Sequence, residues 1–255
     1  MIPYERLDEI MRRLRLNHVI SIHDLAEAIH TSEATIRRDL TVLVKRGQVR
    51  KVFGGVALVN QNTADLPFPL RQRENKIIKE KVAARAVKHL FDGARVILDG
   101  CSTSVQQMLP YIDSKMRLSV ICNSLEMCRY LMGKCAHIYC TGGLLDAKNI
   151  ALLGRYAENT VENIYADIIF FSSDGLNDEG FISDNMEANV TFLRKAMSHA
   201  EKRVYLCDSP KYSYSGAHAL CSLSDVDVVI SDIPPKKGLE DMIGRPPGTG
   251  HFEIA

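Results

Sequence analysis

The stretch from Ser21 to Leu43 constrains the fold more than any other part of this chain, because it encodes two short helices joined by a tight turn. It reads SIHDLAEAIHTSEATIRRDLTVL. Apolar residues recur at the spacing of one helix face, at Ile22, Leu25, Ala26 and Ile29. Ser21 with Asp24 three residues later is a helix-start pattern. A break at His30–Glu33 then leads into the second helix.

The second helix, predicted over Ser32–Lys45, is the one we expect to enter the major groove of DNA. Its apolar face is predicted to bury Ile36, Leu40, Leu43 and Val44. The residues expected to face DNA are Ser32, Thr35, Arg37, Arg38 and Thr41. A short helix, a tight turn and a second helix with paired arginines are typical of a helix-turn-helix. The alternative is an ordinary helical hairpin whose arginines only face solvent.

The sequence on either side favours the DNA-binding interpretation. A first helix is predicted over Tyr4–Arg15, and the chain after the second helix alternates apolar and polar residues as strands do. Gly54-Gly55 is predicted to form the hairpin turn between these strands. Three helices and a basic hairpin predict a winged helix. Arg50 and Lys51 lie where a wing contacts phosphates, which positions a protein on DNA without reading its sequence.

Composition agrees with a DNA-binding head on a nearly neutral body. The first 60 residues hold ten basic and seven acidic side chains, and the remaining chain holds 22 and 24. The chain has no apolar run of membrane-spanning length and no signal-peptide pattern, so we expect a cytoplasmic protein without membrane contact. The seven cysteines form no C-x-x-C pair, and we expect reduced thiols. The eight histidines show no metal-ligand spacing, so we expect no metal and no cofactor.

The rest of the chain predicts a second domain of the α/β class. We expect a winged helix over residues 1–60, a linker over 61–75, an α/β domain over 76–235 and a tail over 236–255. Buried strands are predicted at Val96–Leu98, Leu118–Cys122, His137–Cys140, Asp167–Phe171, Arg203–Cys207 and Val226–Ile230. Helices are predicted at Arg71–Leu90, Val105–Tyr111, Leu125–Met132, Arg155–Asn163 and Glu187–Ala200. This alternation predicts a mostly parallel sheet.

Small and polar residues follow the predicted strands, where open α/β sheets bind their ligands. Backbone N–H groups and hydroxyls at such ends form an anion site, and Lys211 supplies a positive charge. We therefore expect a phosphorylated sugar or polyol there. The candidate residues are Asp99, Ser102, Thr103, Ser104, Asn123, Gly142, Gly143, Asp174, Gly175, Asp208 and Lys211. The alternative is that these residues only terminate strands and cap helices.

The whole layout, from about Tyr4 to Asp232, resembles the DeoR family of bacterial transcription regulators. In the head the likeness rests on SIHDLAEAIHTSEATIRRDL and on GQVRKVFGGVA, and in the body on PFPLRQRENKIIKEKVA, LDGCST, CNSL, TGG and DSPKY. The resemblance implies a sensor domain with the fold of ribose-5-phosphate isomerase and CoA transferases. It also implies phosphorylated sugar effectors, a repressor role at a sugar operon, and assembly into homodimers or homotetramers.

Carried over by position, the resemblance places Asp99, Ser102 and Thr103 in the effector loop. It assigns Asn123, Gly142, Gly143, Gly175, Asp208 and Lys211 to the neighbouring loops. The chain departs from the family pattern at Phe53, Cys101, Ser172, Pro210 and Ser213. Cys101 and Ser172 stand where the family usually has glycine, so the sequence leaves the identity of the effector open.

Two other functions are compatible with this sequence. One is a sugar-phosphate isomerase that keeps a DNA-binding head, with Glu187 or Asp174 as the base that removes a proton from carbon. The other is a transcriptional activator. Because the main interpretation is a regulator, we expect no enzyme activity and no catalytic residue.

Overall fold

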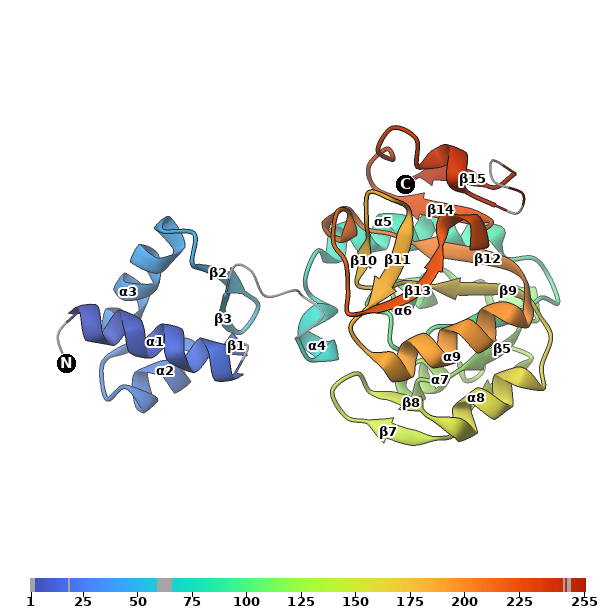
Figure 1. Cartoon of the computed structure of the whole chain (residues 1–255). Helices are drawn as coiled ribbons and strands as arrows, with labels where there is room; N and C mark the ends of the chain where they lie inside the picture. Colours follow the sequence, from blue (N-terminus) through green and yellow to red (C-terminus); the bar gives the residue numbers. More distant parts are fainter. Residues whose placement is uncertain (1–2, 18, 59–65, 245, 247–248) are drawn as a thin grey trace. The chain divides into compact units, whose positions relative to one another are not determined.

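A computed structural model of the chain describes residues 3–17, 19–58, 66–244, 246 and 249–255 (Figure 1). The chain divides into two compact units, Met1–Glu74 and Asn75–Ala255. Of the predicted linker, residues 61–65 lie outside the described residues, and the rest includes a short helix, α4 (Phe68–Arg71). No helix in the described part of the chain has the length and apolar composition needed to cross a membrane.

The first unit is a winged helix, as predicted. Its helices are α1 (Pro3–Asn17), α2 (Ile22–Ala28) and α3 (Glu33–Lys45), and its strands are β1 (Val19–Ile20), β2 (Val49–Val52) and β3 (Gly55–Leu58). The strands form an antiparallel sheet in the order β1-β3-β2. The core includes Ile10, Leu14, Leu25, Ile36, Leu40 and Leu43. Val44 was expected in this core but is 38% exposed, so that prediction is wrong.

Local hydrogen bonds set the start of α2 and α3. The hydroxyl of Ser21 accepts from the backbone N–H of Asp24, and that of Ser32 accepts from the N–H of Thr35. Both satisfy N–H groups that a helix start leaves without intrahelical partners. Inside α3, the buried carboxylate of Asp39 accepts two hydrogen bonds from the Arg6 guanidinium, one of them at 3.0 Å. This pair fixes α3 against α1.

The hairpin turn lies one residue earlier than predicted, at Phe53-Gly54, because Val52 pairs with Gly55. Gly54 adopts a φ of 84°, which suits glycine at the second turn position. Gly55 instead belongs to β3, where a Cβ atom would lie 2.3 Å from the carbonyl oxygen of Ile20. A side chain at Gly55 would therefore push β1 away from β3.

The second unit is built on a seven-stranded sheet whose neighbours are all parallel, in the order β15-β14-β12-β9-β4-β5-β6. The strands are β4 (Arg95–Leu98), β5 (Ser119–Cys122), β6 (His137–Cys140), β9 (Ala166–Phe171), β12 (Ala200–Leu206), β14 (Val228–Ser231) and β15 (His251–Ile254). The expected mostly parallel α/β sheet is confirmed.

Helices cover both faces of this sheet, which explains why its central strands are apolar at successive positions. The helices are α5 (Lys76–Ala86), α6 (Thr103–Gln106), α7 (Leu125–Leu131), α8 (Arg155–Glu162) and α9 (Glu187–Ser198). In β4, Ile97 belongs to the core cluster that includes α8 and α9, and Val96 and Leu98 belong to the cluster that includes α5 and α7. Figure 1 shows α8 and α9 side by side on one face.

Smaller strands form separate sheets in this unit. A hairpin joins β7 (Leu144–Asp146) to β8 (Ala151–Leu153), and a second small sheet has the order β10-β11-β13. The strands of that sheet are β10 (Gly175–Leu176), β11 (Phe181–Asp184) and β13 (His218–Ser222). Turns of 3₁₀ helix lie at Val87–His89, Leu109–Tyr111, Ser114–Met116, Ser209–Lys211, Leu223–Asp225 and Glu240–Met242.

Three predictions about this unit need correction. The helix expected at Arg71–Leu90 is interrupted because Asn75 adopts a left-handed conformation. The helix expected at Val105–Tyr111 is one α turn followed by a separate 3₁₀ turn. The strand His137–Cys140 was expected to be buried, but β6 is the edge of the sheet and mostly exposed. In the predicted tail, β15 forms the opposite edge.

Candidate functional site

The carboxyl ends of the central strands meet where the strand order reverses. From β4 the chain adds β5 and β6 on one side, and β9, β12, β14 and β15 on the other. The reversal lies between β4 and β9, which end next to Asp99 and Ser172. Open parallel sheets bind ligands at such a reversal. The topology therefore selects this edge as the candidate site.

Hydrogen bonds join the loops at this edge. One carboxylate oxygen of Asp99 accepts from the N–H of Cys101 at 3.0 Å, and the other accepts from the N–H of Ser172 at 3.4 Å. The N–H of Gly100 donates to the Asn123 side-chain oxygen at 2.7 Å. Asp99 and Asn123 are both buried. These two side chains therefore set the shape of the loops after β4, β5 and β9.

Lys211 brings a positive charge to the same place. Its Nζ lies 2.6 Å from a carboxylate oxygen of Asp208 and donates to the hydroxyl of Ser172 at 2.6 Å and of Ser104 at 3.4 Å. The Ser104 hydroxyl also donates to Asp208 at 3.4 Å. The side chains of Lys211 and Asp208 are 15% and 4% exposed. The result is a nearly buried cation surrounded by hydroxyl groups.

Two lysines determine the charge state of Asp208. Burial raises the pKa of Asp208, but the ammonium groups of Lys211 and Lys79 outweigh it, so the pKa lies below its usual value. Asp208 is therefore ionised at neutral pH. Lys79 is itself buried in α5 and was not among the predicted site residues. Nothing in its local sequence distinguishes it from the other lysines of that helix.

The remaining predicted residues have separate roles. Ser102 caps α6 by accepting from the N–H of Val105, and the adjacent Thr103 is buried. Gly142 and Gly143 are exposed, and a Cβ atom on Gly143 would lie 2.6 Å from the carbonyl oxygen of Leu153. Gly143 therefore permits the close approach of β8.

Asp174 and Gly175 shape a loop that leads into the small second sheet. One carboxylate oxygen of Asp174 accepts two hydrogen bonds from Asn185, each at 2.9 Å. At Gly175 a Cβ atom would lie 2.2 Å from the carbonyl oxygen of Tyr214. Ser172, noted in the sequence only as a departure from glycine, is the residue that joins Lys211 to the end of β9.

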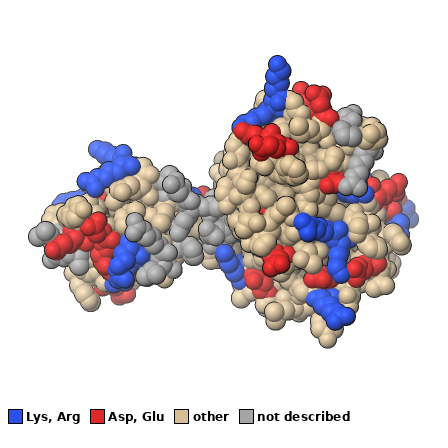
Figure 2. Space-filling view, viewed as in Figure 1, with Lys and Arg blue, Asp and Glu red and all other residues tan. Residues whose placement is uncertain are grey.

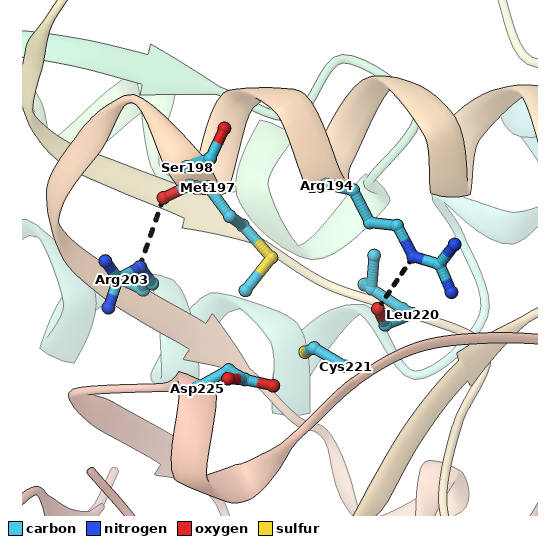
Figure 3. Close-up of a pocket in the computed structure, with 7 residues that line it drawn as sticks. All are labelled: Arg194, Met197, Ser198, Arg203, Leu220, Cys221 and Asp225. Carbon is cyan, nitrogen blue, oxygen red and sulfur yellow. Dashed lines mark hydrogen bonds between the residues drawn. The ribbon is translucent and has the colours of Figure 1, made fainter. Parts of the chain in front are cut away.

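A separate cavity of about 240 Å³ lies near the amino ends of β12 and β14 and contains none of the predicted residues (Figure 3). The two arginines that line it donate hydrogen bonds to backbone carbonyl groups. Arg194 donates to the carbonyl oxygen of Leu220 at 3.1 Å, and Arg203 donates to that of Met197 at 3.1 Å. The predicted effector-binding residues therefore lie at the opposite end of the sheet, beyond the carboxyl ends of its strands.

In the first unit, α3 presents a polar surface. Arg38 is exposed, and Arg37 pairs with Glu33 one helical turn earlier at 3.2 Å. The hydroxyl of Thr41 donates to the carbonyl oxygen of Arg37, and the hydroxyls of Ser32 and Thr35 are 2.9 Å apart. On the face shown in Figure 2, acidic and basic side chains of the described residues are interspersed.

The two predicted wing cations differ. Arg50 is half-buried and pairs with Glu74 at 3.4 Å, whereas Lys51 is exposed. Arg73 lies over the Phe53 ring, 3.8 Å from its centre, so the segment ending at Glu74 contacts the wing through both Arg73 and Glu74. This makes Lys51 the better placed of the two to meet a phosphate, and gives Arg50 a structural role that the sequence did not indicate.

Comparison with known proteins agrees with this architecture. Residues 6–62 match the family described as "DeoR-like helix-turn-helix domain", and residues 74–233 match the family described as "DeoR C terminal sensor domain". The L-fucose operon activator of Haemophilus influenzae is 30% identical, over 83% of this chain and 85% of its own. The lactose phosphotransferase system repressor of Staphylococcus epidermidis is 27% identical, over 91% and 93%.

Among solved structures, ribose 5-phosphate isomerase A from Methanocaldococcus jannaschii is 20% identical, with a TM-score of 0.40 over 55% of each chain. The two family matches together span both units, and the relatives align over most of their length. The chain belongs to the DeoR family of transcription regulators, with a DNA-binding winged helix followed by a sensor domain.

Proposed function

We propose that this regulator is a repressor of an operon for sugar metabolism and that a phosphorylated sugar releases it from its operator. Relatives named for the lactose phosphotransferase system and for the L-fucose operon support the sugar class. One of them is a repressor and the other an activator, so these relatives do not determine whether this regulator represses or activates its operon. Repression is part of our proposal. Regulation by ligand binding needs no chemical step, and no enzyme activity is part of this function.

The observation that carries the effector proposal is the buried cation among hydroxyls at the strand-order reversal. A phosphate group that displaces the Ser172 and Ser104 hydroxyls from Lys211 would give the ammonium a negatively charged acceptor in place of neutral ones. Because α6 is a single turn, Lys211 supplies the main attraction for the phosphate. The sugar hydroxyls would meet the surrounding loops that Asp99 and Asn123 hold in place.

On the DNA side, we assign base contacts to Arg37 and Arg38, supported by Thr35 and Thr41, and phosphate contacts to Lys51 and Ser32. Arginine side chains that read guanine do so through two hydrogen bonds in the major groove. Arg37 would exchange its exposed pair with Glu33, which at the surface is worth less than about 1 kcal/mol, for such contacts. Arg50 would reach a phosphate only by leaving Glu74.

Release of DNA would come from a change between protomers. A homodimer or homotetramer places two winged helices on half-sites about 34 Å apart, one turn of DNA. An effector that binds more tightly to an arrangement with a different spacing lowers the affinity for DNA. The size of that loss is limited by how much more tightly the effector binds this arrangement than the DNA-bound one. Two crystal forms, with DNA and with effector, that showed identical spacing of the winged helices would remove this part of the proposal.

The test is DNA binding by the purified full-length protein to its own upstream region at a fixed moderate salt concentration. A panel of sugar phosphates is titrated in, with the unphosphorylated sugars as the matched control. Release by one phosphate and not by its sugar is the expected result. Specific binding that no phosphate changes would overturn the effector proposal, and an absence of specific binding in every condition would overturn the repressor proposal.

The same preparation is assayed for interconversion of aldose and ketose phosphates. Turnover that is lost on replacing Asp174 or Glu187 would assign the chain to an isomerase instead. The position of the bound operator decides the sign of regulation, because a repressor site overlaps the promoter whereas an activator site lies upstream of it.

A further inference from the structure

Three cysteines gather on one face of the sheet beside the candidate site. Cys122 ends β5 and Cys140 ends β6, and the two are direct partners in the parallel register. Cys128 lies on α7, which connects these two strands. Its Sγ donates to the carbonyl oxygen of Cys122 at 3.8 Å. Residues in register on neighbouring parallel strands lie about 4.8 Å apart and point to the same face, so α7 places the third thiol over the other two.

The three thiols differ in exposure and in charge. Cys122 and Cys128 are buried, and Cys140 is exposed at the sheet edge. Hydrogen bonding to Cys122, and secondarily to Cys140, outweighs burial and lowers the pKa of Cys128 to about 7. Burial raises the pKa of Cys140, and the hydrogen bond to Cys128, together with burial, raises that of Cys122. Because the thiolate is the reactive form of cysteine, Cys128 is the nucleophile of the group and Cys140 the neighbour open to solvent.

We propose that Cys128 and Cys140 form an oxidation site for hydroperoxides, with a disulfide between β6 and α7 as the product. The Cys128 thiolate attacks the peroxide oxygen, an S–O bond forms, and the O–O bond breaks. The leaving oxygen takes up a proton and departs as an alcohol or water, so the sulfur is oxidised to a sulfenic acid and the peroxide is reduced. The deprotonated Cys140 sulfur then attacks the sulfenic sulfur, and hydroxide leaves with a proton as water.

The disulfide would act on the loops next to the sheet edge. The carbonyl oxygen of Cys122 accepts from both the Cys128 thiol and the N–H of Thr141. The next residue, Asn123, holds the N–H of Gly100. Moving the Cys128 sulfur toward Cys140 removes its hydrogen bond to that carbonyl. Oxidation therefore alters the contacts that connect the loops after β4, β5 and β6.

The test uses the full-length protein, exposed to hydrogen peroxide and then alkylated, digested and analysed by mass spectrometry. The expected product is a Cys128–Cys140 linked peptide, with two of the seven thiols lost. In Cys140→Ser the Cys122 thiol remains beside Cys128, but its raised pKa keeps it protonated, so a sulfenic acid should accumulate on Cys128 and be trapped by dimedone. Cys128→Ser should lose both products. The half-exposed thiols supply the matched controls, and Cys135→Ser and Cys221→Ser should form the link as the unmodified chain does.

Circular dichroism and thermal melting of each variant before oxidation separate a chemical effect from loss of folding. Reduction by dithiothreitol should restore all seven thiols. A link between any other pair, an unchanged thiol count, or equal oxidation of Cys135 in the intact chain would overturn the proposal. These readouts do not depend on DNA or on a sugar phosphate, so they stand or fall separately from the proposed repressor function.

Discussion

At the residue scale, the pair of Asp208 and Lys211 makes stability depend on pH. The folded protein holds the pKa of Asp208 below its usual value, so the unfolded chain binds more protons near pH 4. The stabilisation is present above the unfolded pKa of about 3.9 and is lost as pH falls through the folded one. We expect Asp208→Asn to unfold about 3 kcal/mol more easily in urea at pH 7, because it leaves the Lys211 charge nearly buried without its partner.

The pH series supplies the check on this explanation. The stability difference between the unmodified chain and Asp208→Asn should stay level down to about pH 5 and then shrink as the pH falls from about 5 toward 3. A difference that stays constant over that range would show that lost packing, and not the charge of Asp208, causes the effect. The exposed pair of Asp178 and Lys236 provides a comparison, since removing it should change stability little.

Lys211 itself should separate effector response from DNA binding. Lys211→Met keeps most of the length of the side chain and removes its charge, so a bound phosphate would lose its charge-assisted contact. We expect the sugar phosphate concentration for half-release of DNA to rise about tenfold or more, which corresponds to about 1.4 kcal/mol, with DNA affinity unchanged. Gel-shift titration measures both quantities. Lys115→Met, at an exposed lysine outside the site, is the control, and an equal shift in both variants would contradict the assignment.

Two basic residues of the winged helix should have different effects on DNA. Arg38→Ala removes a proposed base contact, so it should cost about 1–3 kcal/mol and relax sequence preference at one operator position. Lys51→Ala removes a phosphate contact, so it should weaken specific and random DNA alike and reduce the slope of log affinity against log salt by about 1. Binding measured at several salt concentrations, on operator and scrambled DNA, distinguishes the two. Equal losses of specificity would contradict this division of roles.

At the element scale, the wing depends on Gly55, because the neighbouring strand leaves no space for a side chain at this position. Gly55→Ala brings a Cβ atom to within 2.3 Å of the Ile20 carbonyl oxygen, so β1 must separate from β3. We expect a loss of about 3 kcal/mol in the winged helix, the upper end for overpacking, with the sensor unit unaffected. Gly47→Ala is the control, because Gly47 has a positive φ but open space and should lose only about 1 kcal/mol. Equal losses, measured by urea unfolding, would rule out the clash.

The sequence predicted an element well where burial on both faces gives a run of apolar residues, or where a polar residue caps the start of a helix. The apolar run of β9 and the Ser21 cap of α2 are examples. The missed strands are too short or too polar for a periodic signal, such as Val19–Ile20 and His251–Ile254, and pairing with distant strands defines them. The same reason applies to the site. Lys211 was predicted by its charge, but its contact with Ser172 depends on where β9 ends.

At the scale of the whole molecule, the two units have separate hydrophobic cores, and this predicts how function divides between them. The core of the first unit includes Ile10 and Leu43, whereas the two cores of the second lie on either face of the parallel sheet. We expect residues 75–255 expressed alone to bind the sugar phosphate with the affinity of the full chain, measured by calorimetry. Residues 1–74 include the segment that packs on the wing through Arg73 and Glu74, so this fragment should fold and bind DNA.

The separated winged helix should nevertheless differ from the full protein in two ways. It should bind operator DNA about 100-fold or more weakly, because two linked winged helices gain effective concentration that one alone lacks. It should also ignore the sugar phosphate, because the differential affinity that releases DNA belongs to the sensor unit. Gel shifts with both proteins on one operator measure these effects. If the isolated fragment bound as tightly as the full chain, DNA binding would not require a paired arrangement, and release by changed half-site spacing would lose its physical basis.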